Sequence, residues 1–428
     1  MFLSRTKTSR AHKDRHLHSL EPLALRRARI GLHGAFATSG FVMGAWAAAL
    51  PGVDARLGLG EARLGTALLL IQLVGLATMA VTGRIADRVT TRKLLLWAGP
   101  ATQLVLLAPA FAADYGTLLA AAALYGVGVG VIEVGINAHS VELEQRYGRP
   151  IISAFHGLWS LGGAAAGALT SLGLGLGLGN QAILIAVAII GTVAMAVSTR
   201  PLLPPPGRDN SGGSSGAPGR RIGFVLLTAL FVLGLGGHLV ESGAIDWANL
   251  HAANVLGADD ALAPLSYTVF ACAMTVFRLF GDPIRAKLGP ARTLLAAGAL
   301  AAAGYALVLV SAVSFNGAAG GLPLAWTGWL LAGSGIAVIV PVLFSAVGAA
   351  GGSPSNIALI SMSGSTGLLL GPAAIGYIGE ATGLTGGLAV PAALAVVIAL
   401  AGPTTMRRLL NRPTAAPAET KPPATATV

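Results

Sequence analysis

The chain has 428 residues, of which 54% are hydrophobic and only 11% are charged. An average soluble protein carries about 25% charged residues, and the mean hydropathy here is +0.73 over the whole length. This composition excludes a soluble enzyme, a disordered regulator and a nucleic-acid-binding module. It indicates a protein whose apolar surface lies in a lipid bilayer.

Apolar runs of roughly 20 residues, the length needed to cross a bilayer, recur along the whole chain. They lie near 29–50, 63–82, 93–112, 116–138, 151–173, 180–198, 222–243, 262–281, 293–313, 322–347, 356–379 and 384–403. The runs are apolar throughout, whereas strands of a membrane barrel alternate with a period of two. We therefore predict an all-α polytopic membrane protein with 12 transmembrane helices.

Two halves of six runs each are joined by a segment rich in Pro, Gly and Ser, which is typical of a flexible linker. The predicted parts are a basic cytoplasmic tail (1–28), an N-terminal six-helix bundle (29–198), a cytoplasmic linker (199–221), a C-terminal six-helix bundle (222–403) and a disordered cytoplasmic tail (404–428). Two pseudo-symmetric bundles arranged in this way are typical of secondary transporters.

The basic residues predict the orientation of the chain in the membrane. Of the 28 Lys and Arg residues, all but Arg56 and Arg63 lie in the tails, the linker and the loops of one side. Because basic loops stay in the cytoplasm, we expect both termini there. The formal net charge of +11 then reflects orientation beside anionic lipids, and no nucleic-acid partner is expected.

The segment GRIADRVTTRK (83–93) resembles the signature loop between helices 2 and 3 of the major facilitator superfamily. The matching residues are Gly83, Asp87, Arg88, Arg92 and Lys93, whereas Thr90 stands where the signature usually has Gly. Three further stretches (134–163, 241–247 and 277–289) resemble uncharacterised bacterial inner-membrane permeases near the fucose-permease group. The resemblance covers about residues 30–403. It implies a multi-pass protein of the cell (inner) membrane that is a transporter, not an enzyme.

The resemblance also implies a conformational latch on the cytoplasmic side. In the superfamily, the acid that matches Asp87 lies against the N-terminus of helix 11, and here Ser353-Pro354-Ser355-Asn356 is a suitable helix start. Asp282 is the counterpart in the second half, and we expect Arg278, four residues earlier, to pair with it. The basic residues of the signature are equally explained as orientation signals.

Charges inside the apolar runs are few, and each costs at least about 2.5–3.5 kcal/mol to insert. We expect Glu133 and His156 at similar depth on adjacent helices. Glu241 is expected near the periplasmic end of its run, followed by Asp246 and Trp247 at the interface. A buried carboxylate and a histidine can exchange protons, so Glu133, His156 and Glu241 are candidates for proton coupling. A structural hydrogen-bonded cluster is the alternative.

In the superfamily, the substrate cavity is lined mainly by helices 1, 4, 7 and 10. The candidate side chains on the corresponding runs are Trp46, Asn137, His238 and Ser334. No sequence motif has the spacing of a metal site or of a Walker loop, so we expect no cofactor and no direct use of ATP. The expected partners are a small-molecule substrate and protons, within the lipid bilayer, and we expect a monomer.

These observations favour proton-coupled uptake of a sugar-like or other small polar metabolite by alternating access. Efflux members of the superfamily often carry a Gly-Pro motif in helix 5, whereas the run 151–173 has glycines and no Pro. A drug or metabolite efflux pump of the same fold and a non-transporting membrane receptor remain alternatives.

The latch yields the first prediction. Asp87→Asn removes the charge that faces the helix dipole, so transport in proteoliposomes is expected to fall while membrane insertion is unchanged. If equal amounts of inserted Asp87→Asn and unaltered protein transport at the same rate, Asp87 does not act as a latch.

Overall fold

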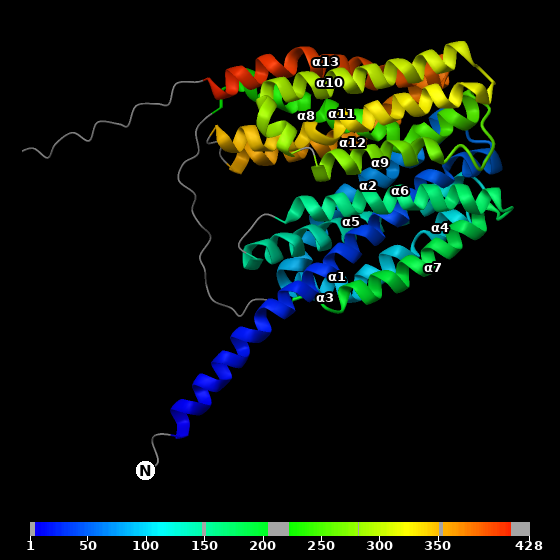
Figure 1. Ribbon diagram of the computed structural model, residues 1–428. Coiled ribbons are helices and arrows are strands. Elements are labelled where there is room, and N and C mark those ends of the chain that lie inside the picture. The colour runs from blue at the N-terminus through cyan, green and yellow to red at the C-terminus, as the bar shows by residue number, and fades with distance from the viewer. Residues whose placement is uncertain (1–4, 148–150, 204–221, 281, 351–353, 412–428) are drawn as a thin grey trace, which may run out of the picture.

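The computed structural model describes residues 5–147, 151–203, 222–280, 282–350 and 354–411. All regular secondary structure in these ranges is helical, and the helices form two bundles that lie side by side (Figure 1). The expected all-α class is confirmed.

The first bundle consists of α1 (Arg5–Leu57), α2 (Glu61–Val89), α3 (Thr91–Leu104) with the short α4 (Leu107–Ala110), α5 (Tyr115–Tyr147), α6 (Ile152–Gly175) and α7 (Asn180–Thr199). The second consists of α8 (Phe224–Leu250) with the π-helical turn η1 (His251–Val255), α9 (Leu265–Phe280), α10 (Asp282–Ser314), the 3-10 turn η2 (Ala319–Gly321), α11 (Leu322–Ala349), α12 (Pro354–Thr382) and α13 (Leu384–Leu410). Because α3 and α4 together form one crossing, each bundle has six, as expected. Among the described residues, nine helical segments are long and apolar enough by themselves to span a membrane.

Three boundaries differ from the sequence-based expectation. The helix α1 already begins at Arg5, within the expected tail, and α13 continues to Leu410, so the expected disorder from residue 404 is wrong for 404–410. The linker residues 204–221 and the tail from 412 lie outside the described ranges. The helix α8 continues seven residues beyond the expected end at residue 243.

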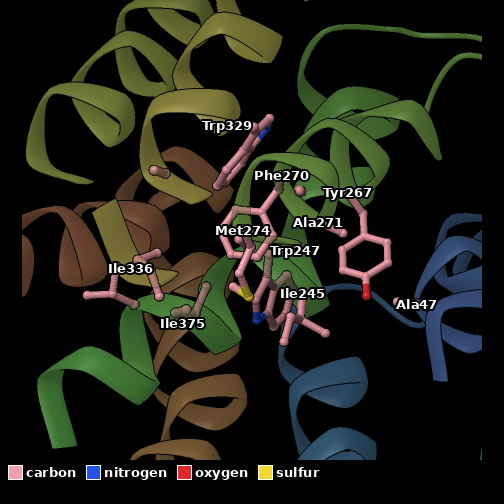
Figure 2. Close-up of a cluster of buried hydrophobic side chains, with 14 of the residues drawn as sticks. Ala47, Ile245, Trp247, Tyr267, Phe270, Ala271, Met274, Trp329, Ile336 and Ile375 are labelled. Atoms are coloured by element: carbon pink, nitrogen blue, oxygen red, sulfur yellow. The ribbon is translucent and has the colours of Figure 1, made fainter. Parts of the chain in front are cut away.

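This longer α8 changes the position of the residues expected at the membrane interface. Trp247 is fully buried and Asp246 is 8% exposed, and the Asp246 carboxylate accepts a 2.8 Å hydrogen bond from the Ser242 hydroxyl. Figure 2 shows Trp247 inside a buried cluster, with Phe270 and Met274 of α9 among its members. Asp246 and Trp247 are therefore enclosed by other helices, and neither side chain is exposed to lipid as an interfacial anchor would be.

Glycines allow the helices of each bundle to approach closely. A Cβ atom built on Gly44 of α1 would lie 2.6 Å from the backbone of Gly163 of α6. In the second bundle, a Cβ atom on Gly304 of α10 would lie 2.5 Å from the carbonyl oxygen of Gly328 of α11. Small residues at such crossings bring helix backbones into van der Waals contact, which drives helix association in lipid.

The two bundles meet through α2 against α12 and through α6 against α9. We call the end of the molecule where α1 begins and α13 ends the terminal face (Figure 1), and the opposite end the distal face. Near the distal face, Asn249 of α8 donates from Nδ2 to the Ala47 carbonyl of α1 (3.0 Å). Asn254 of η1 donates to the Asp54 carboxylate of α1 (3.1 Å). These hydrogen bonds join the two bundles near the distal face.

The loops before α3 and in α10 share one backbone conformation. Thr90 has φ 83° and ψ 142°, and Gly289 has φ 73° and ψ 163°. Thr90 is the only non-glycine residue with positive φ among the described residues, and its Oγ1 accepts the Lys93 N–H (3.4 Å). Only glycine adopts this region at little cost, which explains why the signature usually has Gly where this chain has Thr90.

This geometry predicts opposite effects for two alanine substitutions. No atom lies within 4 Å of a Cβ built on Gly289 or on Gly83, so neither methyl group clashes. Gly289→Ala is expected to lower the free energy of unfolding by about 1–3 kcal/mol through backbone strain. Gly83→Ala, within α2, is expected to raise it by about 0.5–1 kcal/mol. Unfolding in mixed micelles with increasing SDS, followed by circular dichroism, measures both, and equal effects would contradict the interpretation.

Candidate functional site

An ion pair lies where the two bundles meet. The guanidinium group of Arg278, near the end of α9, contacts the Glu241 carboxylate of α8 (Nη2 to Oε1, 2.9 Å). The same guanidinium donates from Nη1 to the hydroxyl of Ser160 on α6 of the other bundle (3.1 Å). We call these three residues the Arg278 junction. It connects helices of both halves through one cationic side chain.

The junction is largely shielded from solvent, since the side chain of Arg278 is 19% exposed and that of Glu241 is 10% exposed. A charge at membrane depth is tolerated when an opposite charge and hydrogen bonds compensate it. Arg278 therefore pairs with Glu241, and its expected pairing with Asp282 stays a prediction. The side chain of Asp282 lies outside the described part of the structure.

His156 lies one helical turn before Ser160 on α6 and belongs to the same region. Its ring packs edge-on against Phe36 of α1 (centroids 5.3 Å apart). The Ser160 hydroxyl donates to the His156 carbonyl (3.3 Å). Two of the three proton-coupling candidates, His156 and Glu241, are thus brought together at the interface between the bundles.

Glu133, the third candidate, has separate surroundings. Its carboxylate and its carbonyl each accept a 2.9 Å hydrogen bond from the Asn137 side-chain amide, one turn later on α5. Within the described residues, no hydrogen bond or ion pair joins Glu133 to His156. The pair Glu133–Asn137 is therefore a local polar contact on one helix.

The other cavity candidates are each satisfied by near neighbours. Trp46 is buried beside Tyr125 of α5 (centroids 5.8 Å apart). His238 hydrogen-bonds through Nδ1 to the Gly234 carbonyl (2.9 Å), and the Ser334 hydroxyl donates to the Leu330 carbonyl (2.8 Å). In the part of the chain that the structure describes, no contact joins these side chains to one another.

A narrow space adjoins the junction between α6, α8 and α9. It has no room for a water molecule, and it is lined by Trp159, Ser160, Ile245, Tyr267, Phe270, Ala271 and Met274. Figure 2 shows Tyr267, Phe270, Ala271 and Met274 along α9 at this level. In the present state the side chains fill this space and exclude a solute.

Sequence reasoning missed two members of this region and misjudged a third. Ser160 and Tyr267 were not among the candidates, because a lone hydroxyl in an apolar run carries little signal. Arg278 lies near the end of its run and was assigned to the cytoplasmic edge. Its pairing with Glu241 depends on how α8 and α9 pack together, and the sequence gives no local signal of it.

The signature residues lie at the terminal face. Arg92 donates from Nε to the Leu202 carbonyl (2.9 Å), which fastens the start of α3 to the chain after α7. Arg88 is exposed, and a Cβ atom on Gly83 would meet no other atom within 4 Å. The side chain of Asp87 lies outside the described part of the structure, so its latch contact stays a prediction.

The chain resembles known transporters in sequence. The family model described as Major Facilitator Superfamily matches residues 32–354. An uncharacterised MFS-type transporter of Yersinia pestis is 30% identical over 64% of this chain and 70% of the relative. The uncharacterised transporter y4wD of Sinorhizobium fredii is 28% identical over 65% and 74% of the two chains.

Solved structures show the same fold. The crystal structure of the nucleoside transporter NupG superposes with a TM-score of 0.67 at 15% identity and covers 90% of this chain and 100% of that chain. An auto-inhibited POT family peptide transporter superposes with a TM-score of 0.63 at 14% identity, covering 92% and 99%. At this level of identity the similarity shows the fold alone.

The junction yields a stability prediction. Arg278→Gln leaves the Glu241 charge without its partner and is expected to lower the free energy of unfolding by about 3–5 kcal/mol. The double variant Glu241→Gln/Arg278→Gln removes both charges and is expected to recover most of this loss. Arg292→Gln, at an exposed position of α10, is the matched control and is expected to change little.

Unfolding in mixed micelles measures these differences for five proteins: the unaltered chain, Arg278→Gln, Glu241→Gln, the double variant and Arg292→Gln. A double variant as unstable as the sum of the two single variants would show that Arg278 and Glu241 do not interact energetically.

Proposed function

Because this chain belongs to the major facilitator superfamily, we propose that it is a proton-coupled secondary transporter of a small polar solute. The superfamily consists of secondary transporters, which are not enzymes, and the chain is a multi-pass membrane protein. The observation that carries the finer proposal is the Arg278 junction, because it places a carboxylate and a cation at the contact between the two moving halves.

Protonation of Glu241 would change the net charge of the Arg278 junction, and this change can couple proton binding to the relative movement of the two bundles. In the present state Glu241 neutralises Arg278. Protonation of Glu241 would remove that compensation, and the guanidinium would then retain only Ser160 of the other bundle and whatever polar group the solute supplies. Because Arg278 contacts both bundles, its rearrangement alters the interface on which alternating access depends. His156 lies close enough to respond to the same change.

The surroundings of the junction support a small polar solute with hydroxyl groups. The adjoining space carries Trp159 and Tyr267 as rings and Ser160 as a hydroxyl, a combination that binds sugar-like rings by stacking and hydrogen bonding. We propose uptake as the direction. A drug or metabolite efflux pump is the second candidate, and a non-transporting receptor is the third.

We also propose that the protein lies in the inner membrane with its terminal face in the cytoplasm. The bacterial relatives support this membrane. The concentration of basic residues at the terminal face supports this orientation through the positive-inside rule. The distal face would then be periplasmic.

The coupling proposal is tested by separating binding, exchange and proton movement. A thermal-shift screen of the purified protein against monosaccharides and other polar metabolites first identifies a ligand, which raises the apparent stability. In proteoliposomes containing a pH-sensitive dye, a gradient of that ligand is expected to move protons. Glu241→Gln is expected to abolish proton movement while exchange of labelled ligand across the membrane continues.

Asp114→Asn is the matched control, because Asp114 is an exposed acid that accepts hydrogen bonds from Thr117 in the first turn of α5. It is expected to leave both measurements unchanged. If Glu241→Gln still moves protons at the normal rate, a residue other than Glu241 carries the coupled proton. Ligand binding without exchange or proton movement would favour the receptor.

A further inference from the structure

The helices α2 and α12 are matched partners from the two halves. Each has 29 residues, and each carries an acid two residues before its last residue, Asp87 in α2 and Glu380 in α12. The chain runs along α2 from the distal to the terminal face and along α12 in the opposite direction. Each acid therefore lies at the end where the partner helix begins.

At the distal face the acid of α12 reaches the first turn of α2. Glu380 Oε2 accepts the backbone N–H of Ala62 (3.3 Å). The residue that precedes α2, Gly60, offers no side chain for this purpose. The unpaired N–H groups at the start of a helix attract a negative charge, so α2 receives its cap from the other bundle.

Neighbouring contacts hold the same two helix ends together. The hydroxyls of Thr66 and Tyr377 are hydrogen-bonded, 2.9 Å apart. A Cβ atom on Gly65 would lie 2.9 Å from the Pro372 carbonyl oxygen, so the helix backbones touch directly below the cap. Separation of the bundles at the distal face must break the contact between Glu380 and α2.

We propose that Glu380 is the lock of the distal face, acting by capping α2 across the two bundles. It opposes the expected latch of Asp87 on α12 at the terminal face, and only one of the two contacts forms in a given state of the alternating-access cycle. This inference rests on the proposed function only in assuming that the two halves move. Glu380 is a gating residue and does not contact the solute.

Cysteine accessibility in lipid nanodiscs tests the lock without a substrate. Cys272, the native cysteine, is replaced by Ser, and Ala373→Cys serves as the reporter because Ala373 is 8% exposed and faces Gly65 of α2. Glu380→Ala is expected to increase the rate of reaction with a membrane-impermeant maleimide by about two- to fivefold, the factor that corresponds to a charge at a helix terminus. Glu380→Gln retains an acceptor and is expected to give a smaller increase.

Asp259→Ala is the matched control, because Asp259 is a distal-face acid that caps the Leu262 N–H within its own loop. It is expected to leave the labelling rate unchanged. Size-exclusion chromatography checks that each variant is folded. Thr66→Val removes the hydrogen bond to Tyr377 and so weakens the contact between α2 and α12 independently of Glu380. Unchanged labelling in folded Glu380→Ala, or an equal increase in Asp259→Ala, overturns the proposal. Because no solute is used, a failure here is distinct from a failure of proton coupling.

Discussion

A cationic side chain between two helical bundles must be compensated, because the membrane interior offers no solvent to do it. Arg278 meets this constraint with a carboxylate from its own bundle and a hydroxyl from the other. The arrangement makes the interface between the halves sensitive to the charge of one residue, Glu241. Stability and proposed function therefore depend on the same contact, and any change in it affects both.

Close packing of small residues sets where the bundles can touch. The glycines of α1, α6, α10 and α11 bring helices together within each half, so that each bundle can move as a unit. Near the distal face, three side chains make hydrogen bonds between the halves. Asn249 and Glu380 bond to backbone groups, and Asn254 bonds to the Asp54 carboxylate. The contacts of Asn254 and Glu380 are exposed and therefore weak individually. Asn249 is buried, and its side chain also accepts the Tyr267 N–H (3.0 Å).

The fold brings together some of the residues selected from the sequence and separates others. Intramembrane charge selected Glu241 and His156, which the fold brings to one region. The same reasoning placed Glu133 with them, but its carboxylate is occupied by Asn137 on its own helix. Arg278 was assigned to the membrane edge because one basic residue near the end of an apolar run resembles an orientation signal.

Hydropathy and charge by themselves determined the membrane class, the helical crossings and the division into halves, because a bilayer imposes length and polarity on every segment separately. The superfamily was indicated by the resemblance of residues 83–93 to its signature loop. Only the tertiary structure decided that Arg278 pairs with Glu241, that Trp247 is buried and that Glu380 caps α2. These facts depend on which helices are neighbours and how each is rotated. Packing of small residues between segments distant in the sequence determines the neighbours and the rotation of each helix. Local sequence patterns do not show which distant segments pack together.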